Sequence, residues 1–218
     1  SFVPMQYNTA LGFLLCGLGL IFISLEKPVL GGSLGGIASL IGIITLVQYI
    51  LEVNAGLDEL FMGHYVKVKT SHPGRMAPNT GLCFVLSGIA LSLNHKINKK
   101  INTITTAITF EALGAIVIGL GLVAMAGYLF ELESAYGWGN LTRMAVHTSI
   151  GFIILGVGLF RIAMPRLEQD RHPRFPVFLA VGLLVVSISF WKTLIIEEEK
   201  NTKNLIRQEV DHIKSLLN

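Results

Sequence analysis

The sequence predicts an all-α membrane protein: a polytopic bundle of six transmembrane helices with internal two-helix repeats and a C-terminal extramembrane helix. Apolar residues make up 52% of the 218 residues and charged residues only 14%, whereas soluble domains carry about 25% charged residues. The apolar residues form runs near the roughly 20 residues that a helix needs to cross a bilayer. The alternative, a soluble helical bundle, would have too little polar surface to cover its core.

The apolar runs place the six helices, and they lack the strict alternation of barrel strands. The runs cover about 9–25, 35–53, 78–93, 109–130, 144–164 and 175–195. We therefore expect a transmembrane domain at 1–196 and a polar C-terminal helix at 197–218.

One phrase recurs near the start of the first, third and fifth runs, at 5–17, 76–88 and 144–156. Each copy has Met, then Asn or His three residues later, then Thr, with Phe and Gly at the same further offsets. Copies of such length and spacing are typical of a membrane domain built from duplicated helix pairs. We therefore expect Phe13, Phe84 and Phe152 to lie at matching depth and to point the same way.

Each repeat unit pairs one helix with the motif-bearing helix that follows it. The first members of two units share Tyr49 and Glu52 in one case and Tyr128 and Glu131 in the other. The helix at 9–25 has no preceding partner in the sequence. Either an upstream helix is missing or the first unit is half-sized.

Loop charges predict the orientation of the chain. The linkers after the first, third and fifth runs, counted together with Arg161 near the end of the fifth run, hold eight Lys and Arg residues, and the two linkers on the other side hold four. Basic loops stay in the cytoplasm, so both ends of the chain should lie outside. The expected location is the inner (cytoplasmic) membrane of a bacterium, in a multi-pass arrangement with membrane lipids as partners.

The motif supplies the candidate binding residues Asn8, Asn79 and His147. Three helix N-termini at one level would favour an anionic or carbonyl-bearing ligand. Tyr136 and Trp138, from a nearby linker, would add apolar walls, a combination that suits a small amphiphile such as a lipid or quinone head group. The alternative is that each Asn–Thr or His–Thr pair only caps its own helix.

Other chemistry is not indicated. The sequence has no P-loop, no nucleophile elbow and no zinc-protease motif, so we expect no enzyme activity and no cofactor. His64 and His72, with Asp58 or Glu59, lack any recognised metal-ligand spacing, and no metal is predicted. The scattered basic residues do not indicate nucleic-acid binding.

The tail carries an apolar seam. Ile206, Val210, Ile213 and Leu217 recur at four-three-four spacing, which suits a two-stranded coiled coil or docking on a neighbouring helix. A homodimer or a complex with partner membrane subunits is therefore expected.

Three phrases, at 73–80, 135–139 and 143–148, resemble the membrane input region of bacterial sensor histidine kinases and diguanylate cyclases. That region precedes a CHASE-type extracellular sensory domain. The resemblance implies a membrane-embedded sensory or anchoring module. The chain itself contains neither a phosphoacceptor helix nor a cyclase motif. A small-molecule transporter, or a non-catalytic subunit of a larger membrane complex, is the alternative.

Overall fold

The computed structural model describes residues 3–54, 56, 58, 72, 74–93, 103–138, 141–167, 195, 198–199, 202–211 and 213–214. All regular secondary structure in these residues is helical, which confirms the predicted all-α class. The labelled helices are α1 (Tyr7–Ser24), α2 (Pro28–Ile50), α3 (Pro78–Leu93), α4 (Thr103–Leu129), α5 (Glu133–Tyr136) and α6 (Val146–Leu167). A further helical stretch covers 202–211.

Five of the six apolar runs correspond to helices. The largest difference lies at the start of α2, which begins at Pro28 rather than near residue 35. Proline suits the first helical position because it has no N–H group to leave unpaired, so the Gly-rich segment after Pro28 joins the helix. The run at 175–195 lies outside the described residues except for Ile195.

Among the residues that the structure describes, three helices are long and apolar enough to cross a membrane: Tyr7–Ser24, Pro28–Ile50 and Ile108–Leu129. The apolar helices Pro78–Leu93 and Val146–Ile162 are shorter. These helices indicate a membrane protein.

The bundle is organised around three aromatic rings, one from each motif-bearing helix. Phe13 of α1, Phe84 of α3 and Phe152 of α6 have ring centroids 4.7 to 5.1 Å apart. Phe84 and Phe152 are completely buried. The three rings thus meet at one level, as expected for residues at matching depth that point the same way.

Small residues allow the rings to meet. A Cβ atom on Gly12 would lie 2.6 Å from the Phe84 ring, and one on Gly151 would lie 2.6 Å from the Phe13 ring. A side chain at either glycine would displace a ring, so α1, α3 and α6 can approach only with glycine there.

The helices α2 and α3 pack through a pair of glycine contacts. A Cβ atom on Gly42 would lie 2.5 Å from the carbonyl oxygen of Gly81, and one on Gly88 would lie 2.3 Å from that of Gly35. Close backbone approach of this kind is how membrane helices associate. Two hydroxyl groups, on Ser39 and Ser92, reinforce the pair by donating to carbonyl oxygens across it.

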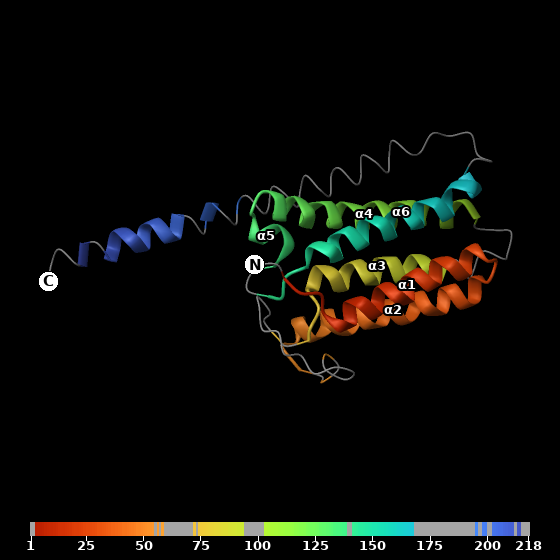
Figure 1. Ribbon diagram of the computed structural model, residues 1–218, viewed down its shortest axis with the longest axis horizontal. Helices are drawn as coiled ribbons and strands as arrows, with labels where there is room; N and C mark the ends of the chain where they lie inside the picture. The colour runs from red at the N-terminus through yellow and green to blue at the C-terminus, as the bar shows by residue number, and fades with distance from the viewer. Residues whose placement is uncertain are drawn as a thin grey trace.

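The helices α4 and α6 repeat this contact at equivalent positions. A Cβ atom on Gly156 would lie 2.8 Å from the carbonyl oxygen of Gly114, and one on Gly121 would lie 2.8 Å from that of Ser149. Figure 1 shows α4 beside α6, with the long helices of the bundle along one common direction, and the glycine contacts place α2 against α3. The sequence repeat is thus a repeat of helix packing.

Candidate functional site at the motif end of the bundle

We call the end of the bundle at which α1, α3 and α6 begin and α2 and α4 finish the motif end (Figure 1). The buried side-chain ion pair and the interhelical tyrosine hydrogen bonds described below lie here. These contacts connect the linkers to the helices, and they define the candidate functional site.

Two tyrosines occupy equivalent positions and make equivalent hydrogen bonds. The Tyr49 hydroxyl group donates to the carbonyl oxygen of Met76 at 3.0 Å, and the Tyr128 hydroxyl group donates to that of Met144 at 2.8 Å. Each methionine opens a copy of the motif. The carbonyl groups just before a helix lie outside its hydrogen-bond ladder, and these tyrosines satisfy them from the neighbouring helix.

The chain leaves α2 and α4 in the same conformation. Glu52 has φ 53° and Glu131 has φ 57°. Both lie in the left-handed backbone region, which costs conformational energy for any residue with a side chain. The two helices therefore end in the same turn. In both turns a glutamate occupies the position with positive φ.

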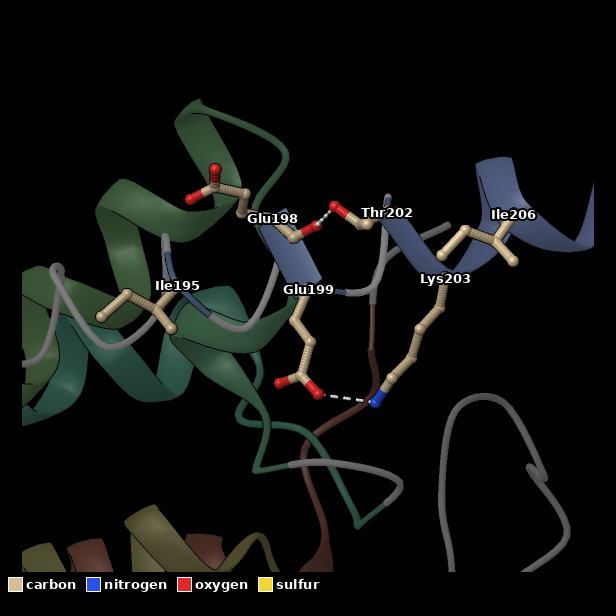
Figure 2. A pocket seen from close by; sticks show the side chains of 6 residues that line it. All are labelled: Ile195, Glu198, Glu199, Thr202, Lys203 and Ile206. Atoms are coloured by element: carbon tan, nitrogen blue, oxygen red, sulfur yellow. Dashed lines mark hydrogen bonds and ion pairs between the residues drawn. The ribbon is translucent and has the colours of Figure 1, made fainter.

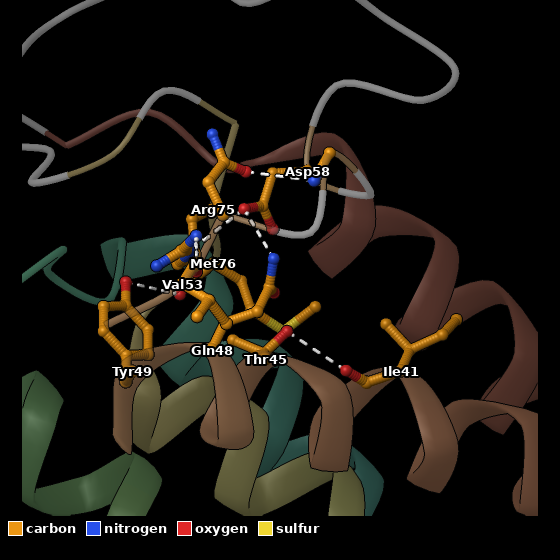
Figure 3. Close-up of polar contacts among 10 residues, drawn as sticks. Ile41, Thr45, Gln48, Tyr49, Val53, Asp58, Arg75 and Met76 are labelled. Atoms are coloured by element: carbon orange, nitrogen blue, oxygen red, sulfur yellow. Dashed lines mark hydrogen bonds and ion pairs between the residues drawn. The ribbon is translucent and has the colours of Figure 1, made fainter. Parts of the chain in front are cut away.

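The first linker is held by a buried ion pair, which Figure 3 shows. The Arg75 Nε group donates to Asp58 Oδ2 at 2.9 Å, and the two side chains are 0% and 5% exposed. Gln48 Nε2 donates to the same oxygen at 3.1 Å, and Arg75 Nη2 donates to the carbonyl oxygen of Val53 at 3.0 Å. The guanidinium carbon lies 5.2 Å from the centre of the Tyr49 ring, a cation–π distance.

This cluster contains buried polar atoms that make no hydrogen bond with the described residues. Within the described part of the chain, Arg75 Nη1 and Gln48 Oε1 are buried without a hydrogen-bond partner, as are both amide atoms of Gln6. Buried polar groups of this kind are usually satisfied by a water molecule or a polar group of a ligand. Among the described residues, the cluster therefore leaves one donor, Arg75 Nη1, and one acceptor, Gln48 Oε1, for such a partner.

The second linker is held by a more exposed version of the same pair. Arg143 Nη2 lies 2.7 Å from Glu133 Oε2, with side chains 20% and 34% exposed. The Tyr136 ring stacks on the Tyr128 ring at a centroid distance of 4.0 Å. In this copy a tyrosine ring takes the place beside Tyr128 that the guanidinium group takes beside Tyr49.

Two of the predicted binding residues come together. Asn79 Nδ2 donates to the backbone carbonyl oxygen of Tyr136 at 3.3 Å, and Asn79 Oδ1 accepts from the Thr80 N–H group at 3.0 Å. Both residues are buried. The Asn79 side chain thus joins the start of α3 to the second linker. Asn8 is also buried, at the start of α1.

The other two predicted binding residues lie nearer the surface. His147 is exposed and Trp138 is 44% exposed. The pocket formed by Asn8, Asn79, His147, Tyr136 and Trp138 stays a prediction.

Sequence reasoning missed the cluster of Gln48, Asp58 and Arg75. A signal was present, because Arg75 and Arg143 each stand directly before the Met of a motif copy. Their acidic partners could not be found by spacing, since Asp58 lies 17 residues before Arg75 and Glu133 only 10 before Arg143.

The residues considered for a metal site, His64 and His72 with Asp58 or Glu59, make other contacts where the structure describes them. Asp58 is engaged by Arg75, and His72 packs edge-on to Tyr49 at a centroid distance of 6.3 Å. His64 and Glu59 lie outside the described residues. Among the residues that are described, no three His, Cys, Asp or Glu side chains lie close enough to hold a metal ion.

A surface hollow of about 590 Å³ lies along the C-terminal helix (Figure 2), lined by Ile195, Glu198, Glu199, Thr202, Lys203 and Ile206. The Lys203 ammonium group lies 2.6 Å from Glu199 Oε1 and lowers the pKa of that carboxyl group. The six described lining residues all belong to the segment 195–206. It is separate from the motif end.

Comparison of the chain with protein-family models, with curated proteins and with solved structures gives no match.

Proposed function

We propose that this chain is a membrane-embedded sensory and anchoring module of a bacterial signal-transduction receptor, with six membrane spans in the inner membrane. The resemblance to receptor input regions supports this role. The phrases that carry the resemblance contain Arg75, Tyr136 and Arg143, the residues that attach the linkers to the helix starts. A rigid connection between linkers and helices is what a module needs to pass a structural change across the membrane.

The observation that carries the proposal is the exposed seam of the C-terminal helix. Ile206, Val210 and Ile213 are 57%, 43% and 55% exposed, and their spacing places them on one face of the helix. An apolar seam on a polar helix is buried by pairing. In a homodimeric receptor this helix would pair with its copy and lead into the extracellular sensory domain.

The pairing is tested by single cysteines along 204–214 in membranes from cells that produce the protein, with Cys16→Ala and Cys83→Ala as background. Ile206→Cys and Val210→Cys should give disulfide-linked dimers under mild oxidation. The matched control is Gln208→Cys, on the opposite face, which should remain monomeric. Equal crosslinking at all positions, or none at any, would contradict a paired seam.

The signalling role itself is tested at the level of the gene and of transport. The proposal predicts that the reading frame continues beyond Asn218 into a sensory domain and then a kinase or cyclase. A stop codon directly after Asn218, together with solute uptake by proteoliposomes containing the purified protein, would favour the transporter instead.

A further inference from the structure

The C-terminal helix carries a heptad pattern of charges as well as of apolar residues. Residues 202–211 and 213–214 are helical, and Figure 1 shows the longer stretch beyond the motif end, away from the labelled helices. The seam residues Ile206, Val210 and Ile213 are all exposed. Their four-three spacing makes Val210 an a position of a heptad and the two isoleucines d positions. The neighbouring residues thereby receive defined places beside the seam.

Charged residues of opposite sign flank the seam on its two sides. Glu209 takes the g position, directly before Val210. Arg207 and Lys214 take the e positions, directly after the two isoleucines. All three charged side chains are exposed. The acidic residue therefore lies on one flank and the basic residues on the other, a pattern by which coiled-coil helices select a partner and an orientation.

The spacing of these charges fits a parallel pair of identical helices. In a parallel pair without axial shift, a g residue lies beside the e residue of the next heptad in the other helix, five positions later. Five positions after Glu209 is Lys214. The twofold symmetry of a homodimer repeats this contact, so two carboxylates would each meet an ammonium group. Within one chain the same two side chains lie on opposite flanks of the seam and do not face each other.

An antiparallel pair would bring like charges together. In that arrangement e residues face e residues, and g residues face g residues. Arg207 and Lys214 would then meet basic residues of the other helix, and facing like charges oppose association. The charges therefore favour the parallel pair, which is also the orientation of two copies inserted the same way in one membrane.

The unshifted register is favoured over a shift by one heptad. A shifted pair would keep one ion pair of this kind, between Glu209 and Arg207 of the other copy, and would lose the second. It would also place Lys203, the residue at the preceding a position, against Val210. A lysine at a single a position fixes the register of a coiled coil at a cost in stability. Without the shift, each apolar residue of the seam meets its own counterpart.

We propose that Glu209 and Lys214 select a second copy of this chain as the partner of the seam, through two ion pairs between the copies of a parallel, unshifted dimer. The inference rests on the homodimer of the proposed function. It adds the residues that decide which helix the seam accepts and in which register.

Disulfide formation between single cysteines tests orientation and register in membranes from cells that produce the chain. With Cys16→Ala and Cys83→Ala as background, Ile206→Cys and Ile213→Cys should each give disulfide-linked dimers. Each d residue faces its own counterpart in an unshifted parallel pair. The matched control is Leu205→Cys, an exposed apolar position beside the seam, which should remain monomeric.

Charge reversal tests the ion pairs themselves, with Ile206→Cys as the reporter. Glu209→Lys and Lys214→Glu should each slow disulfide formation about threefold at low salt, because each variant places like charges at both contacts. The variant with both reversals restores opposite charges and should recover the original rate. Asp211→Lys is the matched control, since it makes the same change of charge at an exposed position away from the seam. It should leave the rate unchanged.

Three outcomes would overturn the proposal. Dimers that form only when Ile206→Cys and Ile213→Cys chains are produced together, and from neither alone, would show antiparallel pairing. Equal rates in all charge variants would show that the homodimer forms without selection by these ion pairs, so the proposed function would stand and this inference would fail. No dimer from any seam position would exclude the homodimer itself and both proposals with it.

Discussion

Arg75 and Arg143 occupy the same position of the repeat, one residue before the Met of the motif, yet their surroundings differ. Arg75 and its partner Asp58 are buried, and Gln48 and the Val53 carbonyl group each add a hydrogen bond to the pair. Arg143 and Glu133 form a short ion pair that stays in contact with solvent. The comparison shows that both repeat units attach the linker through an arginine at the same position. The acidic partner of that arginine comes from a different place in each linker.

The tyrosines show the reverse pattern. Tyr49 and Tyr128 make the same hydrogen bond to the same carbonyl group of the motif, although one ring faces a guanidinium group and the other a second tyrosine ring. The helix-to-helix contact is therefore common to both units, and the linker chemistry is particular to each. Substitutions of the two tyrosines should therefore cost similar free energies of unfolding, whereas substitutions of the two linker ion pairs should cost different ones.

The largest effect should come from the buried pair. Asp58→Asn removes the negative charge and leaves Arg75 buried without a counter-charge, which should lower the free energy of unfolding by about 3–5 kcal/mol. The measurement is denaturant unfolding of the purified protein in detergent micelles. The double variant Asp58→Leu with Arg75→Met should recover much of this loss, because it removes both charges together. If the double variant is no more stable than Asp58→Asn, the loss comes from packing rather than from an unpaired charge.

An intermediate and equal effect should come from the two tyrosines. Tyr49→Phe and Tyr128→Phe each remove one hydrogen bond to a methionine carbonyl group, at a cost of about 1 kcal/mol. Both variants keep the ring and its stacking. Unfolding of the two variants under the same conditions measures the difference. A gap between them larger than about 1 kcal/mol would show that the two repeat units are not energetically equivalent.

How far the sequence predicted these features depends on the range of the interaction. The helices, the meeting of Phe13, Phe84 and Phe152, and the division into helix pairs follow from periodicity and from a motif of fixed spacing. The Arg75–Asp58 pair does not, because its partners come from a linker whose length differs between the two units. The sequence predicted that Asn79 and Tyr136 lie close together, but it did not predict their hydrogen bond. That bond uses the backbone carbonyl oxygen of Tyr136 rather than its ring.

The smallest effect should come from the exposed pair. Glu133→Gln keeps the size of the side chain and removes the charge that faces Arg143. Since both side chains contact solvent, the ion pair should contribute no more than about 1 kcal/mol. Raising the ionic strength from about 0.1 M to about 1 M shortens the screening length from about 10 Å to about 3 Å, so the difference between wild type and Glu133→Gln should shrink further. Asp58→Asn should show no such salt dependence, because its pair is shielded from the solution. Unfolding of both variants at the two salt concentrations makes the test. A Glu133→Gln loss as large as that of Asp58→Asn, and equally insensitive to salt, would mean that burial does not distinguish the two linkers.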